Sequence, residues 1–146
     1  MDYRIGNKKD LFSILELYKQ LGNNNDSSIT IEEVYEIWDS NIENKNIKYF
    51  VAEENNKIIG SLYICIIPNL SHNVKSIGFI ENVITDEKYR KKGIGKKLMG
   101  MAIEYAKENN CYKVTLQSGV KREEAHKFYE KIGFNGESKK AFELKF

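Results

Sequence analysis

The chain of 146 residues is 41% hydrophobic and 30% charged, which predicts a folded domain with a core and excludes a disordered chain. Its 23 basic and 21 acidic side chains leave a net charge of only +2, which argues against nucleic acid as a partner. The length predicts one domain over residues 1–146. Two cysteines without a disulfide framework and the lack of an apolar leader predict a cytoplasmic protein. No apolar run is long enough to span a bilayer, so no membrane partner is predicted.

The first half of the chain predicts a short strand, two helices and a β-hairpin. The strand is expected at residues 3–6, and Asp10 is expected to cap a helix over 11–18 that Gly22 ends. An asparagine-rich loop, Asn23 to Asn25, precedes a second helix that begins at the capping box Thr30-x-x-Glu33. Two apolar runs joined by Asn55-Asn56, typical of a hairpin, follow at residues 48–54 and 57–67.

The second half alternates strands and helices. The expected elements are a strand, a helix, a strand, a helix closed by Gly133 and a final short strand, over residues 76–85, 96–110, 111–117, 121–132 and 142–146. A strand–helix–strand unit implies a parallel pair with a right-handed crossover, whereas the preceding hairpin is antiparallel. The sequence therefore predicts an α+β fold with a mixed, mostly antiparallel sheet.

A glycine-containing, basic stretch lies at the junction between the strand over 76–85 and the following helix. Gly93 and Gly95 permit positive φ and close ligand approach, and a helix N-terminus presents backbone N–H groups to anions. Cations are unfavourable in the first turn of a helix, so a cluster of them there indicates a bound polyanion. The cluster comprises Lys88, Arg90, Lys91, Lys92, Lys96 and Lys97. A solvated basic turn is the alternative interpretation.

The spacing Arg90-x-x-Gly93-x-Gly95 after a strand resembles the pyrophosphate-binding motif of the GNAT superfamily of N-acetyltransferases, and the order of elements is similar along nearly the whole chain. The resemblance implies acetyl-CoA as co-substrate. Its pyrophosphate would bind Arg90 and the amides of Lys91, Lys92, Gly93, Ile94, Gly95 and Lys96. It also implies a bulged strand that splays from its parallel neighbour, with the backbone of Val83 and Ile84 binding the pantetheine arm and thioester.

Two residues are candidates for acid–base catalysis. Glu81 interrupts an apolar strand, shares a face with Val83 by alternation, and is expected to have a raised pKa that suits a general base. An exposed glutamate, with water as the base, is the alternative. Residues 125–134 resemble the family signature A-x-x-F-Y-x-x-x-G-F, which implies that Tyr129 protonates the departing thiolate; otherwise Tyr129 is a core tyrosine.

The acceptor is not determined by the sequence. Resemblance to the superfamily makes Tyr35 and Trp38 candidates for acceptor contact, with a core position as the alternative. Residues 118–129 and the segment around His72 resemble a subgroup that includes aminoalkylphosphonate N-acetyltransferases, whereas residues 110–116 are similar to a strand of glucosamine-phosphate acetyltransferases. Neither histidine has an obvious set of partner ligands, so no metal site is predicted.

The resemblance implies an acetyl-CoA-dependent N-acetyltransferase that acts as a monomer or homodimer on a primary amine of a small molecule, by direct attack within a ternary complex. Two alternatives remain open. One is a protein or peptide N-acetyltransferase, for which an open groove is expected. The other is a catalytically silent CoA-binding regulatory module.

Overall fold

The computed structural model describes residues 1–22 and 25–146, so Asn23 and Asn24 of the expected asparagine-rich loop lie outside the described residues. Two compact units are present, Met1–Thr115 and Leu116–Phe146. The first contains the sheet and most of the helices, and the second contains the C-terminal helix. The α+β fold class expected from the sequence is confirmed.

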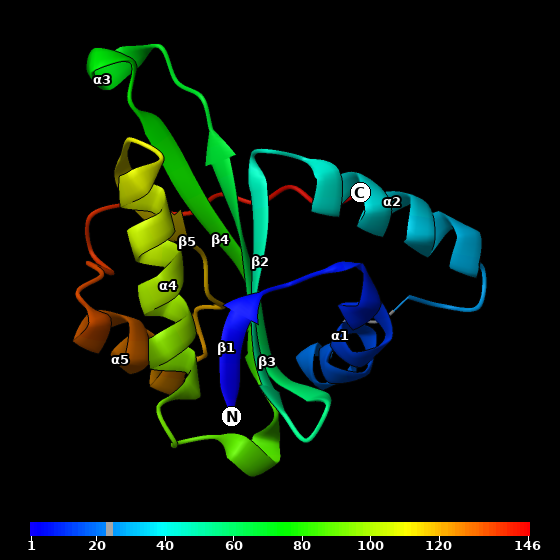
Figure 1. Cartoon of the computed structure of the whole chain (residues 1–146). Coiled ribbons are helices and arrows are strands. Elements are labelled where there is room, and N and C mark those ends of the chain that lie inside the picture. The colour runs from blue at the N-terminus through cyan, green and yellow to red at the C-terminus, as the bar shows by residue number, and fades with distance from the viewer. Residues whose placement is uncertain (23–24) are drawn as a thin grey trace. The chain divides into compact units, whose positions relative to one another are not determined.

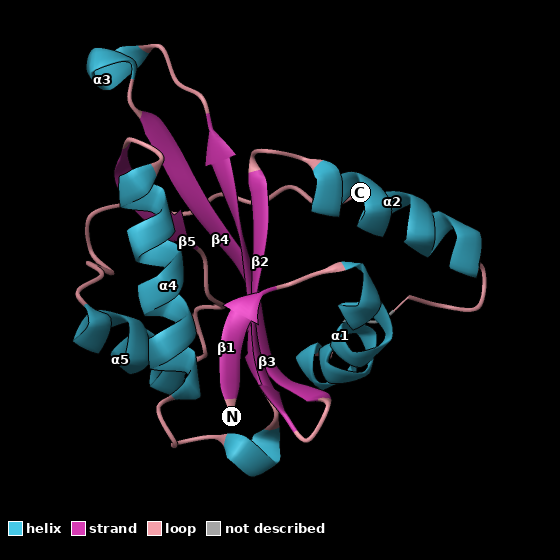
Figure 2. Ribbon diagram, viewed as in Figure 1, coloured by secondary structure: helices cyan, strands magenta, loops and turns pink. Residues whose placement is uncertain are grey.

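A five-stranded sheet in the order β1-β2-β3-β4-β5 forms the centre of the first unit (Figure 2). The first four strands pair antiparallel in sequence order, and β5 lies parallel to β4. Their bounds are β1 Asp2–Ile5, β2 Ile47–Glu54, β3 Lys57–Ile67, β4 Ser76–Thr85 and β5 Cys111–Leu116. The expected hairpin is therefore the β2–β3 pair, which Asn55 and Asn56 connect with positive φ angles of 52° and 59°.

Helices cover both faces of this sheet. Figure 1 shows α1, Leu11–Tyr18, and α2, Ile31–Glu43, on one side, and α4, Ile94–Glu108, on the other. On the side of α1 and α2, a core forms from residues of both helices and of β2, β3 and β4, with buried members Leu11, Ile14, Leu17, Trp38, Tyr49, Val51, Ile58 and Ile84. Short helical turns complete the unit as η1 Lys8–Asp10, η2 Lys19–Leu21, α3 Ser71–Val74 and η3 Glu87–Tyr89.

Gly60 brings β3 against the first turns of α4. A Cβ atom at this glycine would lie 2.8 Å from Ile94 Cγ2 and 3.1 Å from Leu98 Cδ1, both on fully buried side chains. No real side chain tolerates such a contact, so glycine is required there for the helix to sit this close to the sheet. This contact positions the N-terminus of α4.

Two helix starts were predicted from capping residues, and the structure confirms one of the two caps. Thr30 Oγ1 accepts from the N–H of Glu33, and the Glu33 carboxylate accepts from the N–H of Thr30, which confirms the capping box. The prediction for Asp10 is wrong, because its side chain does not cap α1. It accepts instead from the Asn7 N–H at 2.7 Å and pairs with Arg4 at 2.8 Å, which ties η1 to β1.

The second unit contains α5, Glu123–Ile132, which ends at Gly133 with φ 118° as expected. The strand expected over residues 142–146 is wrong, since the structure assigns no strand there. Phe142 and Leu144 are 86% and 81% exposed. Alternating apolar residues indicate a strand only where one face is buried and a neighbouring strand supplies hydrogen bonds, and these side chains bury no face.

Candidate active site

The strand β4 carries a bulge in its second half. Ser61 of β3 pairs with Ile84 and Tyr63 pairs with Glu81, so Leu62 faces two residues, Asn82 and Val83. Asn82 adopts φ 52°, a left-handed conformation that asparagine tolerates better than most residues. An extra residue in one strand breaks the hydrogen-bond ladder and leaves backbone groups unpaired. The bulge therefore coincides with Val83, one of the two residues expected to bind the thioester arm.

This bulge changes which side chains share a face. Glu81 lies directly opposite Tyr63, and Tyr63 packs on the core beneath α1 and α2, as does Ile84. Glu81 and Ile84 thus lie on one face although they are three residues apart. The expectation that simple alternation continues from Glu81 to Val83 is wrong, because the period of two is interrupted at Asn82.

Glu81 adjoins a row of aromatic side chains on the α1–α2 face. The rings of Tyr63 and Tyr49 lie 5.2 Å apart, and the ring of Trp38 lies 4.8 Å from that of Tyr49. Burial, and after it the negative charge of Glu81, raises the pKa of the Tyr63 phenol to about 12. Asn41 Nδ2 donates to Tyr49 Oη at 3.1 Å, which orients that phenol. The row presents polar tips on a largely apolar surface, next to a half-buried carboxylate.

Two further hydroxyl groups lie buried on this face. Tyr18, the last residue of α1, packs on the same core, and Ser61 is fully buried opposite Ile84. Within the described part of the chain, neither Tyr18 Oη nor Ser61 Oγ has a hydrogen-bond partner of good geometry. Burial raises the pKa of Tyr18, and the nearby side chains of Asn82 and Ser61 partly oppose that shift. Buried polar groups are usually satisfied, so these two hydroxyls mark a polar spot beneath the bulge.

The basic glycine loop follows β4 as expected and leads into α4. Gly93 precedes the helix with φ 81°, and Lys91 adopts φ 62°. The left-handed residues are therefore Lys91 and Gly93, whereas Gly95, which also permits positive φ, lies within the helix and does not use that freedom. The first bond inside the helix runs from the Lys97 N–H to the Gly93 carbonyl at 3.0 Å, so the amides of residues 94–96 precede it and point outward from the helix end.

The first turn of α4 contains no side chain that neutralises this end of the helix. Gly93 supplies no capping side chain, and the first turn contains no acidic residue. Lys96 and Lys97 are exposed there, and Lys92 Nζ lies 5.0 Å from the centre of the Tyr89 ring. Arg90 is also exposed, and its Nε donates to the Thr85 carbonyl at the end of β4, at 3.3 Å. Outward-pointing amides, the helix dipole and nearby cations are together suited to binding a polyanion such as a pyrophosphate.

A buried carboxylate missed by the sequence analysis holds the start of this loop. The Asp86 side chain is 4% exposed, accepts from the Lys88 N–H at 3.0 Å and pairs with Lys57 Nζ at 3.1 Å. Burial would raise the pKa of Asp86, but the Lys88 amide and the Lys57 ammonium outweigh it and lower the pKa. Lys57 opens β3, so this pair connects the β2–β3 turn to the segment that enters the glycine loop.

The residues predicted to contact an acceptor occupy different surroundings. Trp38 is 5% exposed and its Nε1 donates to the Lys8 carbonyl at 3.2 Å, so most of its ring is core. Tyr35 is 40% exposed and meets Phe12 edge-on at 5.8 Å. His72 stacks on Tyr112 of β5 at 4.0 Å between ring centres. Only Trp38 is linked to Glu81, through the rings of Tyr49 and Tyr63.

In the second unit, Tyr129 lies on α5 with its ring 5.2 Å from Phe128 and 6.1 Å from Phe134. It is 9% exposed. His126 Nε2 makes a hydrogen bond of 2.8 Å with the Gly119 carbonyl oxygen, which ties the first turn of α5 to the preceding loop. The role of Tyr129 as a proton donor stays a prediction from the motif.

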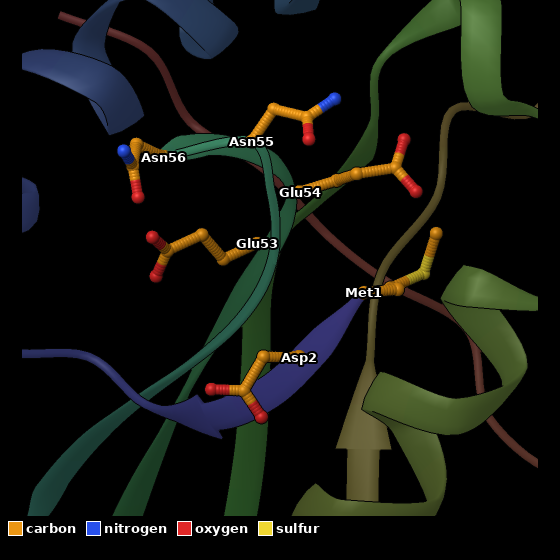
Figure 3. A pocket seen from close by; sticks show the side chains of 6 residues that line it. All are labelled: Met1, Asp2, Glu53, Glu54, Asn55 and Asn56. Atoms are coloured by element: carbon orange, nitrogen blue, oxygen red, sulfur yellow. The ribbon is translucent and has the colours of Figure 1, made fainter.

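A separate acidic hollow of about 590 Å³ lies where β1 meets the β2–β3 turn. Figure 3 shows Asp2, Glu53 and Glu54 lining it together with Met1, Asn55 and Asn56. Three carboxylates repel a phosphate, so this hollow is not the anion site.

Within residues 1–22 and 25–146, no three acidic, histidine or cysteine side chains are grouped so as to hold a metal ion. None of the described helices has the length and apolar character to cross a membrane.

Four residues that surround Glu81 or the bulge were not predicted from the sequence: Tyr18, Ser61, Tyr63 and Asn82. Tyr63 and Ser61 lie in an apolar run where they were indistinguishable from core. Asn82 gave the one usable signal, because an asparagine within a strand is uncommon and suits a left-handed bulge position.

Comparison with known proteins identifies relatives of this arrangement. The model of the acetyltransferase (GNAT) family matches residues 10–134. The glucosamine 6-phosphate N-acetyltransferase of Trypanosoma brucei brucei is 37% identical over 87 residues, which are 60% of this chain and 57% of that protein. The chain thus spans little more than half the length of this curated relative.

Two solved structures resemble the chain over nearly its whole length. A protein from Agrobacterium tumefaciens str. C58 is 35% identical with a TM-score of 0.90, and the alignment covers 100% of both chains. The glucosamine-6-phosphate N-acetyltransferase from Arabidopsis thaliana is 28% identical with a TM-score of 0.84, covering 98% of this chain and 97% of that one.

Proposed function

Because the chain belongs to the acetyltransferase (GNAT) family, we propose that it transfers the acetyl group of acetyl-CoA to a primary amine of a small molecule, by direct attack within a ternary complex. The observation that carries this proposal is that a bulged strand, β4, leads through a glycine loop into the N-terminus of a helix, α4. The bulge at Asn82 and Val83 frees backbone groups for the pantetheine arm, and the loop at Gly93 presents amides to the pyrophosphate.

The chemistry requires a proton to leave the amine and a proton to reach the departing sulfur. Glu81, directly or through a water, takes the proton of the attacking amine as the new C–N bond forms. A backbone N–H of Val83 or Ile84 stabilises the negative charge on the thioester oxygen. Tyr129 donates its phenolic proton to the thiolate as the C–S bond breaks, which yields the amide product and free CoA.

The surroundings of Glu81 favour a small amine that carries polar groups as well as some apolar surface. The acceptor amine is protonated at neutral pH, and the Glu81 carboxylate attracts it toward the bulge. The rings of Tyr49 and Tyr63 supply an apolar wall with polar edges, which suits a sugar or another compact polar molecule. Amino-sugar phosphates are the first acceptors to test, because two of the relatives are glucosamine 6-phosphate N-acetyltransferases.

The proposal is tested by following thiol release from acetyl-CoA over a panel of amines: amino-sugar phosphates, aminophosphonates, polyamines, aminoglycosides and peptide N-termini. We expect release with at least one small amine, and a raised unfolding temperature with acetyl-CoA alone, since a ligand that binds only the folded state stabilises it. Gly95→Asp, which places a carboxylate at the helix N-terminus, should abolish that rise.

Each contrary result would favour one alternative. Release with peptides and with no small molecule would indicate a protein acetyltransferase. Binding of acetyl-CoA without release from any amine would indicate a silent CoA-binding module. An unfolding temperature that acetyl-CoA leaves unchanged would contradict the cofactor site itself.

A further inference from the structure

The hydroxyl group of Tyr18 is buried at a place where packing does not require it. Tyr18 is the last residue of α1, and it packs on the core that contains Ile84. Its Oη atom is buried and, within the described part of the chain, has no hydrogen-bond partner of good geometry. Phenylalanine would fill the same space without the cost of removing a hydroxyl from water. Residues that break such a rule of packing are expected at functional sites.

The polar side chains near this phenol come from the two strands that form the bulge. Asn82 of β4 and Ser61 of β3 both oppose the rise in the pKa of Tyr18 that burial causes, so both lie close to its Oη. Ser61 is fully buried and pairs with Ile84, directly after the bulge, and Asn82 lies in the bulge itself. The end of α1 therefore brings a hydroxyl to the irregular part of β4.

Asn82 is the residue whose backbone makes the bulge irregular. Its φ is 52°, whereas a regular antiparallel strand has a φ of about −140°. A residue other than glycine keeps such a conformation only where its surroundings hold it there. The peptide unit that joins Asn82 to Val83 carries the N–H of Val83, so rotation about the backbone bonds of Asn82 turns that N–H. A contact that holds the Asn82 side chain thus also sets the direction of this amide.

Two further contacts fix the end of α1 relative to β4. The Gln20 side-chain oxygen accepts a hydrogen bond of 3.0 Å from the Glu87 N–H, across 67 positions of the chain. Leu21 packs on the same core as Tyr18. The phenol therefore belongs to a segment that is attached both to the core and to the residues that lead into the glycine loop. It is a fixed point against which Asn82 can be held.

We propose that Tyr18 is a positioning residue for acetyl transfer: its Oη–H donates to the side-chain carbonyl of Asn82 and keeps that residue left-handed, so that the backbone N–H groups of the bulge point at the thioester oxygen. This inference rests on the proposed function. Tyr18 acts only through Asn82, and it touches neither the acetyl group nor the amine. Its hydroxyl should therefore affect the rate of the chemical step and leave cofactor affinity unchanged.

The first test removes one hydroxyl and keeps the ring. Tyr18→Phe should lower kcat with the best amine by about tenfold or more, the equivalent of one hydrogen bond, and leave the Kd of acetyl-CoA within about twofold. Its unfolding temperature should stay the same or rise, because a buried hydroxyl is lost. Tyr105→Phe is the matched control, since it removes a phenol from α4, where the ring packs on Phe50, and its kcat should stay within about twofold of wild type.

A double-mutant cycle tests whether Tyr18 acts through Asn82. Asn82→Gly permits the left-handed conformation but removes the side chain that Tyr18 is proposed to hold. This variant should lose kcat about as much as Tyr18→Phe, and adding Tyr18→Phe to it should change kcat by less than about twofold. Full additivity of the two losses would overturn the inference, as would a Tyr18→Phe variant that keeps the kcat of wild type.

A measurement on the free protein separates this inference from the proposed function. The Cα and Cβ chemical shifts of Asn82 report its backbone conformation by NMR. Tyr18→Phe should move them from left-handed values toward those of an extended strand, and Tyr105→Phe should leave them in place. Shifts of Asn82 that are the same in wild type and Tyr18→Phe would overturn the inference. No turnover is needed, so a chain that binds CoA without transferring acetyl groups leaves this test intact.

Discussion

Glu81 and Tyr63 lie directly opposite each other on the antiparallel strands β4 and β3, one register position before the bulge. The carboxylate acts on the phenol, since its charge adds to burial in raising the pKa of Tyr63 to about 12. This pairing places the candidate base on the face beneath α1 and α2, beside an aromatic wall, and it gives Glu81 a neighbour whose ionisation can be followed.

Glu81→Gln should lower the pKa of Tyr63 from about 12 toward its ordinary value of 10, because the substitution removes a negative charge and keeps the shape of the side chain. The shift can be followed by NMR of ring-labelled tyrosine, with Tyr63→Phe identifying the signal. A Tyr63 titration that is the same in wild type and Glu81→Gln would mean that the two side chains do not interact.

The raised pKa of the Tyr63 phenol predicts that the protein loses stability in alkali. The folded-state pKa of Tyr63 lies above its unfolded value, so its contribution to stability is complete below pH 10 and declines as the pH rises toward 12. Tyr63→Phe should therefore lose less stability than wild type between about pH 10 and 12. Urea unfolding across this range measures the difference, and parallel declines in both proteins would contradict the prediction.

Tyr129→Phe should lower kcat on the order of a hundredfold, the usual contribution of a general acid, while affinity for acetyl-CoA stays nearly unchanged. The phenylalanine ring retains the contacts with Phe128 and Phe134, so the unfolding temperature should change little. Steady-state kinetics with the best amine, together with calorimetric binding of acetyl-CoA, separates these effects. Turnover within twofold of wild type would show that the thiolate leaves without help from Tyr129.

Arg90→Ala should raise the KM for acetyl-CoA roughly tenfold or more, the size expected for a lost charged hydrogen bond, with a smaller change in kcat. Salt should reduce the difference between wild type and variant, because the lost contact is with a phosphate at an exposed site. Lys107→Ala, at the far end of α4, is the matched control and should change the KM little. A normal KM in Arg90→Ala would leave Arg90 as a solvated base.

Asp86→Ala should lower the free energy of unfolding by about 1–2 kcal/mol, the cost of a lost capping side chain. The folded pKa of Asp86 is lowered, so its contribution is present above the unfolded value of 3.8 and is lost as the pH falls through the folded value. Urea unfolding at a series of pH values should show wild type and variant converging in acid. Asp86→Asn keeps a capping oxygen and should be intermediate.

The sequence by itself determined the features that arise from neighbouring residues. The capping box at Thr30, the helix end at Gly22 and the basic loop at Gly93 depend on side chains and φ angles within one or two turns, so their local patterns were sufficient. The order of the five strands and of α1, α2, α4 and α5 followed from hydrophobic periodicity in the same way, whereas the short helix α3 was not predicted. Periodicity failed at Phe142 and Leu144, where alternating apolar residues predicted a strand. Both side chains are exposed, so the alternation does not correspond to a buried face of a sheet.

Only the tertiary structure decided how distant residues meet. The bulge at Asn82 is a property of the register between β3 and β4, and a register exists only once two strands pair. For this reason the sequence identified Glu81 but assigned it the wrong companion, and it did not find Tyr63. Gly60 against Ile94 and Lys57 against Asp86 are contacts across 34 and 29 positions of the chain, and together they place the glycine loop at the end of the bulged strand. Contacts across such separations leave no periodic trace in the sequence, because they are selected by packing in three dimensions.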